Sequence, residues 1–232
     1  MKSSVSKKSS SDFVCSFCSK GYKGERYLLK HVCKQKKRFF DRDTKPARLA
    51  FHAYSKFMLV NYRREPTYEK FMNSEFYDAF LRFGKYILDV DAISPLEYID
   101  YMLKSTIPVD RWCRDSEYLK YVKSLTMKET PHRALERTVI LMQEWAIKHE
   151  AQWQNFFREV SSPLAVQWII SGRLSPWVFL NCKSGQSMLS NFTNEQKSLI
   201  SPSLNTKMWL GKFARFPCEV TDIQSALEDE GL

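Results

Sequence analysis

The sequence has little glycine and no long apolar run. Only seven of its 232 residues are glycine, and no turn dipeptide of the kind that closes a β-hairpin separates alternating apolar stretches. No stretch approaches the 18 or more apolar residues of a membrane-spanning helix. The basic start of the chain has no apolar stretch after it, so it does not have the pattern of a secretory signal. These absences argue against an extensive β-sheet and a membrane domain.

The sequence also lacks the local motifs of common enzymes. It has no glycine-rich phosphate loop, no His-Glu-x-x-His and no Gly-x-Ser-x-Gly. Three of its four histidines, His52, His132 and His149, stand alone. We therefore expect neither catalysis nor a small-molecule substrate. The acids around residue 113 leave one alternative open, a metal-dependent nuclease, although a polar loop between helices explains them equally well. These acids are Asp110, Asp115 and Glu117.

What the sequence does contain is a compact metal-binding pattern near its start. Cys15 and Cys18 are two residues apart and can present both thiolates from one tight turn to a tetrahedral Zn²⁺, and His31 follows at the spacing of a third ligand. Cys33 is the nearest candidate for the fourth. A His-x-Cys pair cannot point the same way on a regular helix, so the helix must unwind at His31 if Cys33 binds. A water, His52 or a residue of the rest of the chain is the alternative fourth ligand.

Phe13, Tyr22 and Leu28 complete the pattern as the core side chains of a small ββα module. With the cysteines and His31, they resemble the C2H2 zinc-finger family over about a tenth of the chain, in a Cys-Cys-His-Cys variant. The resemblance implies one structural Zn²⁺ and a helix that reads bases in the major groove. The corresponding reading positions here are Gly24, Tyr27 and Lys30, a poor set for base recognition. The expected contacts are therefore with phosphates.

Charge supports the same interpretation. Residues 1–64 hold 17 Lys and Arg against four Asp and Glu, a net charge of +13, whereas the whole chain carries +10. All of the excess positive charge therefore lies in the first quarter, as in a segment that binds a polyanion. A basic face that only improves solubility is the alternative. The predicted nucleic-acid-binding residues are Lys23, Arg26, Lys30, Lys34, Lys36, Lys37, Arg38, Arg42 and Arg48.

The rest of the chain is predicted to be helical. Its prolines fall mainly after a Ser or Thr, the pattern of a helix that starts with a hydroxyl cap and Pro in its first turn. Ser94-Pro95-Leu96-Glu97 further reads as a capping box. The predicted helices are 46–63, 67–89, 95–104, 115–127, one after Pro131, 152–159, 163–172, 176–190, 193–200 and 204–213. The fold class is thus mainly α, with a small N-terminal ββα finger followed by an irregular multi-helix bundle.

We expect four parts along the chain. They are a disordered basic tail (1–12), the finger with its basic extension (13–38), a helical region (39–127) and a C-terminal helical region (128–232). Aromatic and basic residues alternate densely within residues 39–90, a combination that can hold single-stranded nucleic acid. Helical spacing places most of these rings in the core, so we favour the cations as binding residues.

A weaker resemblance concerns the C-terminal part. Trp153 to Phe179 looks like the helical domain of T4-type phage helicase-loading proteins in its order of helix, polar turn and helix. The combination of a finger and a helical body also looks like uncharacterised proteins of large tailed phages. The resemblance to the helicase-loading proteins implies binding of forked DNA and recruitment of a replicative helicase. Six cysteines without an export signal favour a reducing compartment, the cytoplasm, or the host cytoplasm for a viral protein.

The function predicted from these features is nucleic-acid binding, to DNA rather than RNA, by a zinc finger attached to a helical body that can bind a protein partner. The alternatives are a protein-interaction adaptor with a structural finger and a phage-type helicase loader.

Overall fold

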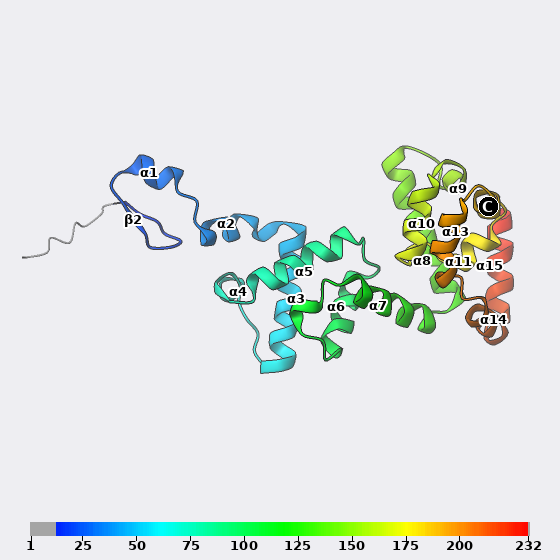
Figure 1. Cartoon of the computed structure of the whole chain (residues 1–232), viewed down its shortest axis with the longest axis horizontal. Coiled ribbons are helices and arrows are strands. Elements are labelled where there is room, and N and C mark those ends of the chain that lie inside the picture. Colours follow the sequence, from blue (N-terminus) through cyan, green and yellow to red (C-terminus); the bar gives the residue numbers. More distant parts are fainter. Residues whose placement is uncertain (1–12, 232) are drawn as a thin grey trace, which may run out of the picture. The chain divides into compact units, whose positions relative to one another are not determined.

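The computed structural model describes residues 13–231 and is mainly α-helical, as predicted. Those residues form 15 α-helices, four short 3-10 helices and a single two-stranded sheet (Figure 1). The predicted tail, residues 1–12, lies outside the described residues. Within 13–231, none of the helices combines the length and apolar character that crossing a bilayer requires.

The chain divides into two compact units. One contains residues up to Leu88 together with Pro108–Asp110, and the other contains Asp89–Ile107 and Arg111–Leu232. The four-part organisation expected from the sequence stays a prediction about folding units.

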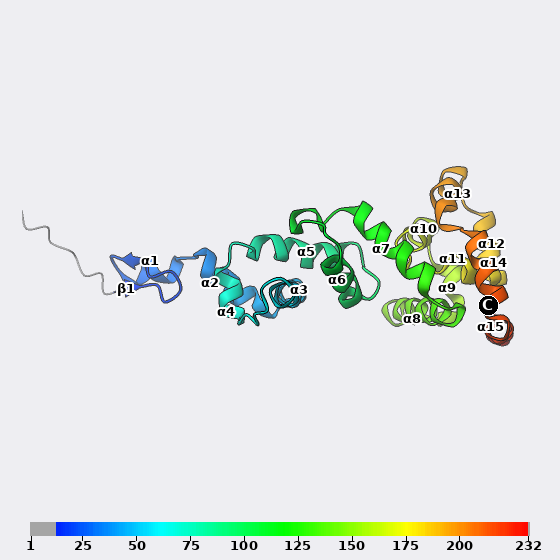
Figure 2. The same ribbon diagram turned by 90° about the horizontal axis from the view of Figure 1, so that it is seen from below.

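The first unit begins with the finger and continues into helices (Figures 1 and 2). Its elements are β1 (Phe13–Val14), β2 (Gly21–Tyr22), α1 (Glu25–Lys30), α2 (Lys34–Phe40), the 3-10 helix η1 (Asp41–Asp43), α3 (Lys45–Tyr62), α4 (Tyr68–Asn73) and α5 (Tyr77–Asp89).

The core of this unit lies where α3, α4 and α5 meet. Phe71, Phe80 and Phe83 are fully buried there, and Tyr54 packs on Phe71 and Phe80 with ring centroids 4.9 and 5.5 Å apart. Gly84 allows α5 to approach the start of α3 closely. A Cβ atom at this position would lie 2.2 Å from the carbonyl oxygen of Pro46.

The second unit contains only helices among its described residues. They are α6 (Pro95–Lys104), η2 (Val109–Arg111, which begins in the first unit), α7 (Asp115–Lys128), α8 (Pro131–His149), η3 (Trp153–Asn155), α9 (Phe156–Glu159), α10 (Ser162–Ile170), α11 (Pro176–Asn181), α12 (Lys183–Ser190), α13 (Asn194–Ile200), η4 (Ser201–Ser203), α14 (Thr206–Arg215) and α15 (Pro217–Asp229).

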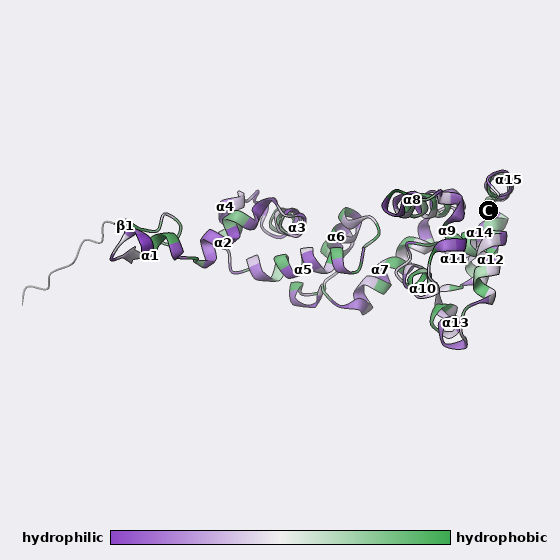
Figure 3. Ribbon diagram, turned by 90° about the horizontal axis from the view of Figure 1, so that it is seen from above, coloured by the Kyte–Doolittle hydropathy of each residue, from purple (hydrophilic) through white to green (hydrophobic). Residues whose placement is uncertain are grey.

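An aromatic core holds the C-terminal helices of this unit together. Phe156, Phe179 and Trp177 are buried in it, and Phe156 stacks on Trp168 with centroids 5.6 Å apart. In both units the helices carry hydrophilic as well as hydrophobic residues along their length (Figure 3). Most of the longer helices have both buried and exposed positions, so they present one face to the core and one to water.

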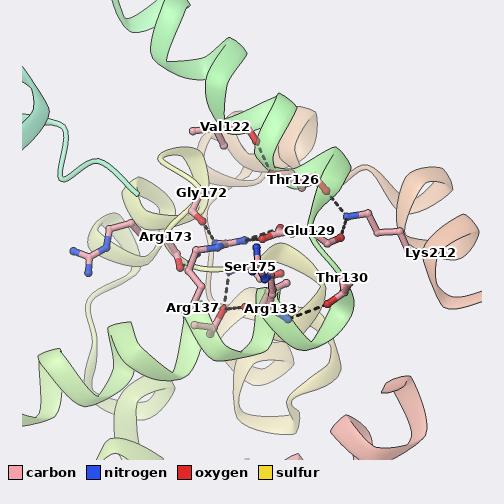
Figure 4. Close-up of polar contacts among 12 residues, drawn as sticks. Val122, Thr126, Glu129, Thr130, Arg133, Arg137, Gly172, Arg173, Ser175 and Lys212 are labelled. Carbon is pink, nitrogen blue, oxygen red and sulfur yellow. Dashed lines mark hydrogen bonds and ion pairs between the residues drawn. The ribbon is translucent and has the colours of Figure 1, made fainter. Parts of the chain in front are cut away.

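A polar network fixes the turn between α7 and α8 (Figure 4). The Arg137 guanidinium donates to both carboxylate oxygens of Glu129, at 2.8 and 3.0 Å. The buried Lys212 ammonium donates to the backbone oxygens of Thr126 and Glu129. These carbonyls lie at the end of α7, where a helix has no partners of its own for them. The lysine therefore acts as a cap for α7 from a helix far away in the sequence.

Most predicted helices are present, but two are interrupted, and the predicted 152–159 helix consists of the 3-10 helix η3 followed by the short α9. The predicted 67–89 helix breaks between α4 and α5, where Ser74 is extended, and the predicted 176–190 helix breaks at the extended Cys182. The helices α2 and α15 were not predicted. At each break the chain changes direction, so that two short helices pack into the core in place of one long helix. The hydrophobic periodicity of the sequence does not reveal such breaks.

The predicted capping box at Ser94 is wrong. Ser94 does precede α6, but its backbone is left-handed, with φ of 44°, and its side chain makes no capping hydrogen bond. Among the Ser/Thr-Pro helix starts, only the Thr130 hydroxyl accepts such a bond, from the Arg133 N–H at 3.3 Å. A capping box is found instead at Thr193 and Gln196. Proline thus marked the helix starts, while the caps depend on local backbone angles.

Candidate metal centre

The finger brings its four predicted ligands together. Phe13 pairs with Tyr22 and Val14 with Gly21 in a two-residue antiparallel ladder. The turn between the strands closes when the Ser19 N–H donates to the Cys15 oxygen at 2.8 Å, with Ser19 in the left-handed region. This turn places Cys15 and Cys18 on the same side.

The helix α1 ends where the sequence required it to end. His31 follows its last residue in an extended conformation, with φ of −74° and ψ of 124°. Two residues later Cys33 starts α2 as its N-cap residue, and its sulfur accepts the Lys36 N–H at 3.3 Å. The prediction that the helix unwinds at His31 is therefore confirmed. The break turns Cys33 toward the other three side chains.

The four donor atoms form one cluster. The ligand atoms of Cys15, Cys18, His31 and Cys33 all lie within 4.8 Å of one another. The Cys15 and Cys33 sulfurs are 4.0 Å apart, and the Cys18 sulfur is 3.2 Å from His31 Nε2. In a tetrahedral site with Zn–S bonds of about 2.3 Å, two sulfurs lie roughly 3.8 Å apart. The cluster can therefore hold a single metal ion.

The chemistry of the donors also fits zinc. Three thiolates and an imidazole form one of the usual ligand sets of structural zinc sites. Burial opposes ionisation of Cys15, but hydrogen bonds from the backbone of Phe17 and Cys18 and from the side chains of Cys18 and Cys33 together lower the pKa of Cys15. A backbone hydrogen bond involving Lys20 favours the Cys18 thiolate, but burial and the neighbouring sulfurs raise the pKa of Cys18. Within residues 13–231, no other group of three His, Cys, Asp or Glu side chains meets the same geometric condition.

The side chains around the cluster match the predicted small core. Phe13, Tyr22 and Leu28 are half-buried, and the Tyr22 ring packs on the His31 ring with centroids 4.8 Å apart. His52, an alternative fourth ligand, instead lies on a groove lined by α2, α3 and α4.

The predicted nucleic-acid-binding residues divide by their surroundings. Lys23, Arg26, Lys30 and Lys37 are exposed and have no ion pair among the described residues. Arg48 is also exposed, and its Nε donates to the Asp43 backbone oxygen at 2.9 Å.

Arg42, Lys36, Lys34 and Arg38 have hydrogen-bond or ion-pair partners within the first unit, and the first three of them lie wholly or partly at its surface. Arg42 is exposed and pairs with Asp43 at 3.3 Å. Lys36 is half-buried and donates to the His31 oxygen. Lys34 pairs with Asp78 at 2.7 Å at the surface.

Arg38 differs from the others because it is buried. Its guanidinium donates to Asp78 at 2.9 Å and to the Met72 oxygen, and it lies 4.0 Å from the Tyr77 ring centroid. It therefore joins α2 to α4 and α5. A count of charges does not show which cation is buried at an internal contact. For this reason Arg38 was predicted, with its neighbours, to bind nucleic acid.

Comparisons with models of known protein families, with curated proteins and with solved structures found no match. The class of site is therefore defined by its own residues: a zinc-finger-like cluster of three cysteines and one histidine, on a mainly helical chain. The resemblance to phage helicase loaders and other phage proteins stays a prediction.

Proposed function

We propose that this protein binds nucleic acid, DNA in preference to RNA, through a zinc-stabilised finger and the cations around it. The observation that carries the proposal is the position of Lys23, Arg26, Lys30 and Lys37. They lie on α1, on α2 and just before α1, the segments that carry or adjoin His31 and Cys33, and they are exposed without ion pairs among the described residues. Such cations can release the counterions condensed on a phosphate backbone.

Zinc would act here as a structural ion. Cys15 and Cys18 from the turn, His31 from the end of α1 and Cys33 from the start of α2 would hold it. The ion would fix α1 and α2 relative to each other. The lysines on these two short helices would then approach a phosphate backbone from a defined surface.

The expected contacts are mainly with phosphates. Tyr27 is 65% exposed at a position that in the resembling family reads a base, and Lys30 is the single cation among the reading positions. A lysine on a backbone phosphate positions a protein without reading sequence.

The experiment is a fluorescence-anisotropy titration of the zinc-loaded protein at several salt concentrations, with duplex DNA, forked DNA, single-stranded DNA and RNA. Six phosphate contacts on duplex DNA predict a log-log salt slope of about −5. Replacing Lys23, Arg26, Lys30 and Lys37 by alanine should flatten the slope by roughly three to four units. Tighter binding to the fork than to both the duplex and single-stranded DNA would support the helicase-loader alternative.

The matched control removes the same charge from the other unit. Lys148, Lys183, Lys197 and Lys207 are exposed there, and their replacement by alanine should leave the slope nearly unchanged. Equal effects of the two fourfold variants, or no binding by the parent at about 0.1 M salt, would contradict the proposal.

Exposed apolar side chains favour a second candidate, docking of the finger on a protein. Leu29 and Val32 are 71% and 73% exposed. If the finger is an adaptor, their replacement by serine should abolish binding to a protein partner. In that case the parent would show little salt-sensitive affinity for any of the four nucleic acids.

A further inference from the structure

We propose that a groove beside the metal centre holds an unpaired nucleobase, so that the first unit prefers single-stranded nucleic acid. The inference rests on the proposed function, because it names which part of the nucleic acid this unit contacts besides phosphate. The groove has a volume of about 850 Å³ and is lined by the turn after Cys15, by α2, η1 and α3, and by α4. Pockets that bind small ligands commonly have volumes of about 300–1,000 Å³.

Two pairs of aromatic rings line the groove. Phe17 from the metal-binding turn packs on Phe39 of α2, with centroids 5.2 Å apart. Phe51 of α3 packs on Tyr68 of α4, with centroids 5.1 Å apart. All four rings are half-buried, so each keeps some surface toward the groove. Base-on-ring stacking accepts any base, because every base has an aromatic face.

Two arginines, Arg42 and Arg48, also line the groove. The Arg42 guanidinium lies over the Phe39 ring, 4.3 Å from its centroid. Arg48 uses its Nε for the Asp43 backbone oxygen, and its two terminal nitrogens have no hydrogen-bond partner among the described residues. A strand whose base enters the groove would bring its phosphates to these two exposed side chains.

Polar side chains in the lining suit the edge of a base. Gln35 and Asn73 carry amides, which can both donate and accept hydrogen bonds. The Asn73 amide nitrogen donates to the Glu69 backbone oxygen at 3.1 Å and leaves its oxygen as an acceptor. A nucleobase combines a planar apolar face with donors and acceptors on its rim, which is the combination that this lining complements.

Charge alone does not explain the groove. Arg42 and Arg48 are balanced in its lining by Asp43 and Glu69, so a free phosphate or another small anion is a poor ligand. The groove therefore discriminates by the base, while the exposed lysines of α1 and α2 hold the backbone.

The test compares two strands with the same number of phosphates, oligothymidylate and an abasic strand of equal length, at fixed salt with the zinc-loaded protein. The parent should bind oligothymidylate about tenfold or more tightly than the abasic strand, given the usual contribution of one stacked base. Phe39→Leu combined with Tyr68→Leu removes one ring from each pair while keeping apolar packing. This variant should bring the ratio close to one.

The control is Phe40→Leu. Phe40 follows Phe39 on the same helix and is 66% exposed, but it does not line the groove. It should keep the preference of the parent. Photocrosslinking of an oligonucleotide that carries 5-iodouracil, followed by peptide mapping, should label residues of the groove in the parent itself, which gives a result independent of how the variants fold.

The outcomes separate the two proposals. Equal, salt-sensitive binding of both strands by the parent would overturn the base site and leave the proposed function intact. The absence of binding to both strands would overturn both. Crosslinks confined to the C-terminal unit would also overturn the assignment of the base to this groove.

Discussion

Cys33 has two structural roles. Its sulfur belongs to the metal cluster and also accepts the Lys36 N–H at the start of α2. The same residue thus links the metal to the orientation of the basic helix. Loss of the sulfur should affect both.

Cys33→Ala should reduce zinc affinity by more than about 100-fold, the upper range for loss of an outer-shell partner of a metal site. Cys33→Ser keeps an N-cap oxygen for α2 but lacks the thiol, so it should lose zinc affinity with a smaller effect on the helix. The measurement is a competition titration with a chromophoric chelator, with the exposed Cys218→Ala as control. If Cys33→Ala retained the parent's affinity while Cys15→Ala did not, another group would be the fourth ligand.

Asp78 is the second residue whose local partners matter. Lys34 and Arg38 both donate to its carboxylate, at 2.7 and 2.9 Å. The hydrogen bond from Lys34 is the main cause that lowers the pKa of Asp78; burial opposes it, and the hydrogen bond and charge of Arg38 add to the lowering. The carboxylate therefore stabilises the folded unit while it is ionised.

The ionisation of Asp78 makes the stability of the first unit depend on pH. Because the folded pKa lies below the unfolded value of about 3.9, the stabilisation is complete above that value and is lost as the pH falls through the folded pKa. Asp78→Asn should lower the free energy of unfolding by at most about 1 kcal/mol at pH 7, since the carboxylate is mostly exposed.

The measurement is urea unfolding of the metal-free parent and variant at pH 7 and in steps below pH 4. The difference between parent and variant should shrink over the acidic steps. Glu75→Gln, at an exposed site of the same unit, should cause no change at any pH. A difference that grows toward acid would contradict the assigned role of Asp78.

Two glycines illustrate what decides stability at the scale of elements. Both Gly84 in α5 and Gly211 in α14 lie inside helices, where propensity alone favours alanine. At Gly84 a Cβ would lie 2.2 Å from the Pro46 oxygen, whereas at Gly211 nothing lies within 4 Å. Propensity should therefore decide the outcome only at Gly211.

Gly84→Ala should destabilise the first unit by about 1–3 kcal/mol, because α5 must move away from the backbone of α3. Gly211→Ala should be neutral or stabilising by up to about 1 kcal/mol. Thermal and urea unfolding followed by far-ultraviolet circular dichroism measures both. Equal stabilisation by the two substitutions would show that α3 and α5 are not packed as closely as the structure has them.

At the scale of the whole molecule, each unit has its own core. The metal cluster and the aromatic core of α3, α4 and α5 belong to the first unit. All six tryptophans, which lie between residues 112 and 209, belong to the second. Tryptophan fluorescence therefore reports on the second unit alone.

Removal of zinc by a strong chelator should speed amide hydrogen exchange in residues 13–40 and leave the tryptophan unfolding midpoint of the second unit unchanged. The reason is that a small metal module has too little apolar core to stay ordered without its ion. Hydrogen exchange with mass spectrometry and tryptophan fluorescence are the two measurements. A shift of the tryptophan midpoint would show energetic coupling between the units.

Local spacing determined much of this protein by itself. The spacing of Cys15, Cys18, His31 and Cys33 predicted the metal cluster and the break after α1. One continuous helix cannot point both His31 and Cys33 at the same metal ion. Prolines after Ser or Thr predicted helix starts, because the fixed φ and the missing N–H of proline act within the first helical turn.

Only the tertiary structure decided which residues share a surface. In the folded chain Arg38 is buried against Tyr77 and Asp78, and Lys212 donates to carbonyl oxygens at the end of α7. Aromatic rings from four separate segments line one groove. These contacts depend on how short helices pack and on where the chain breaks between them. Side chains far apart in the sequence meet only when those packing choices have been made, so periodicity and charge counts do not reveal them.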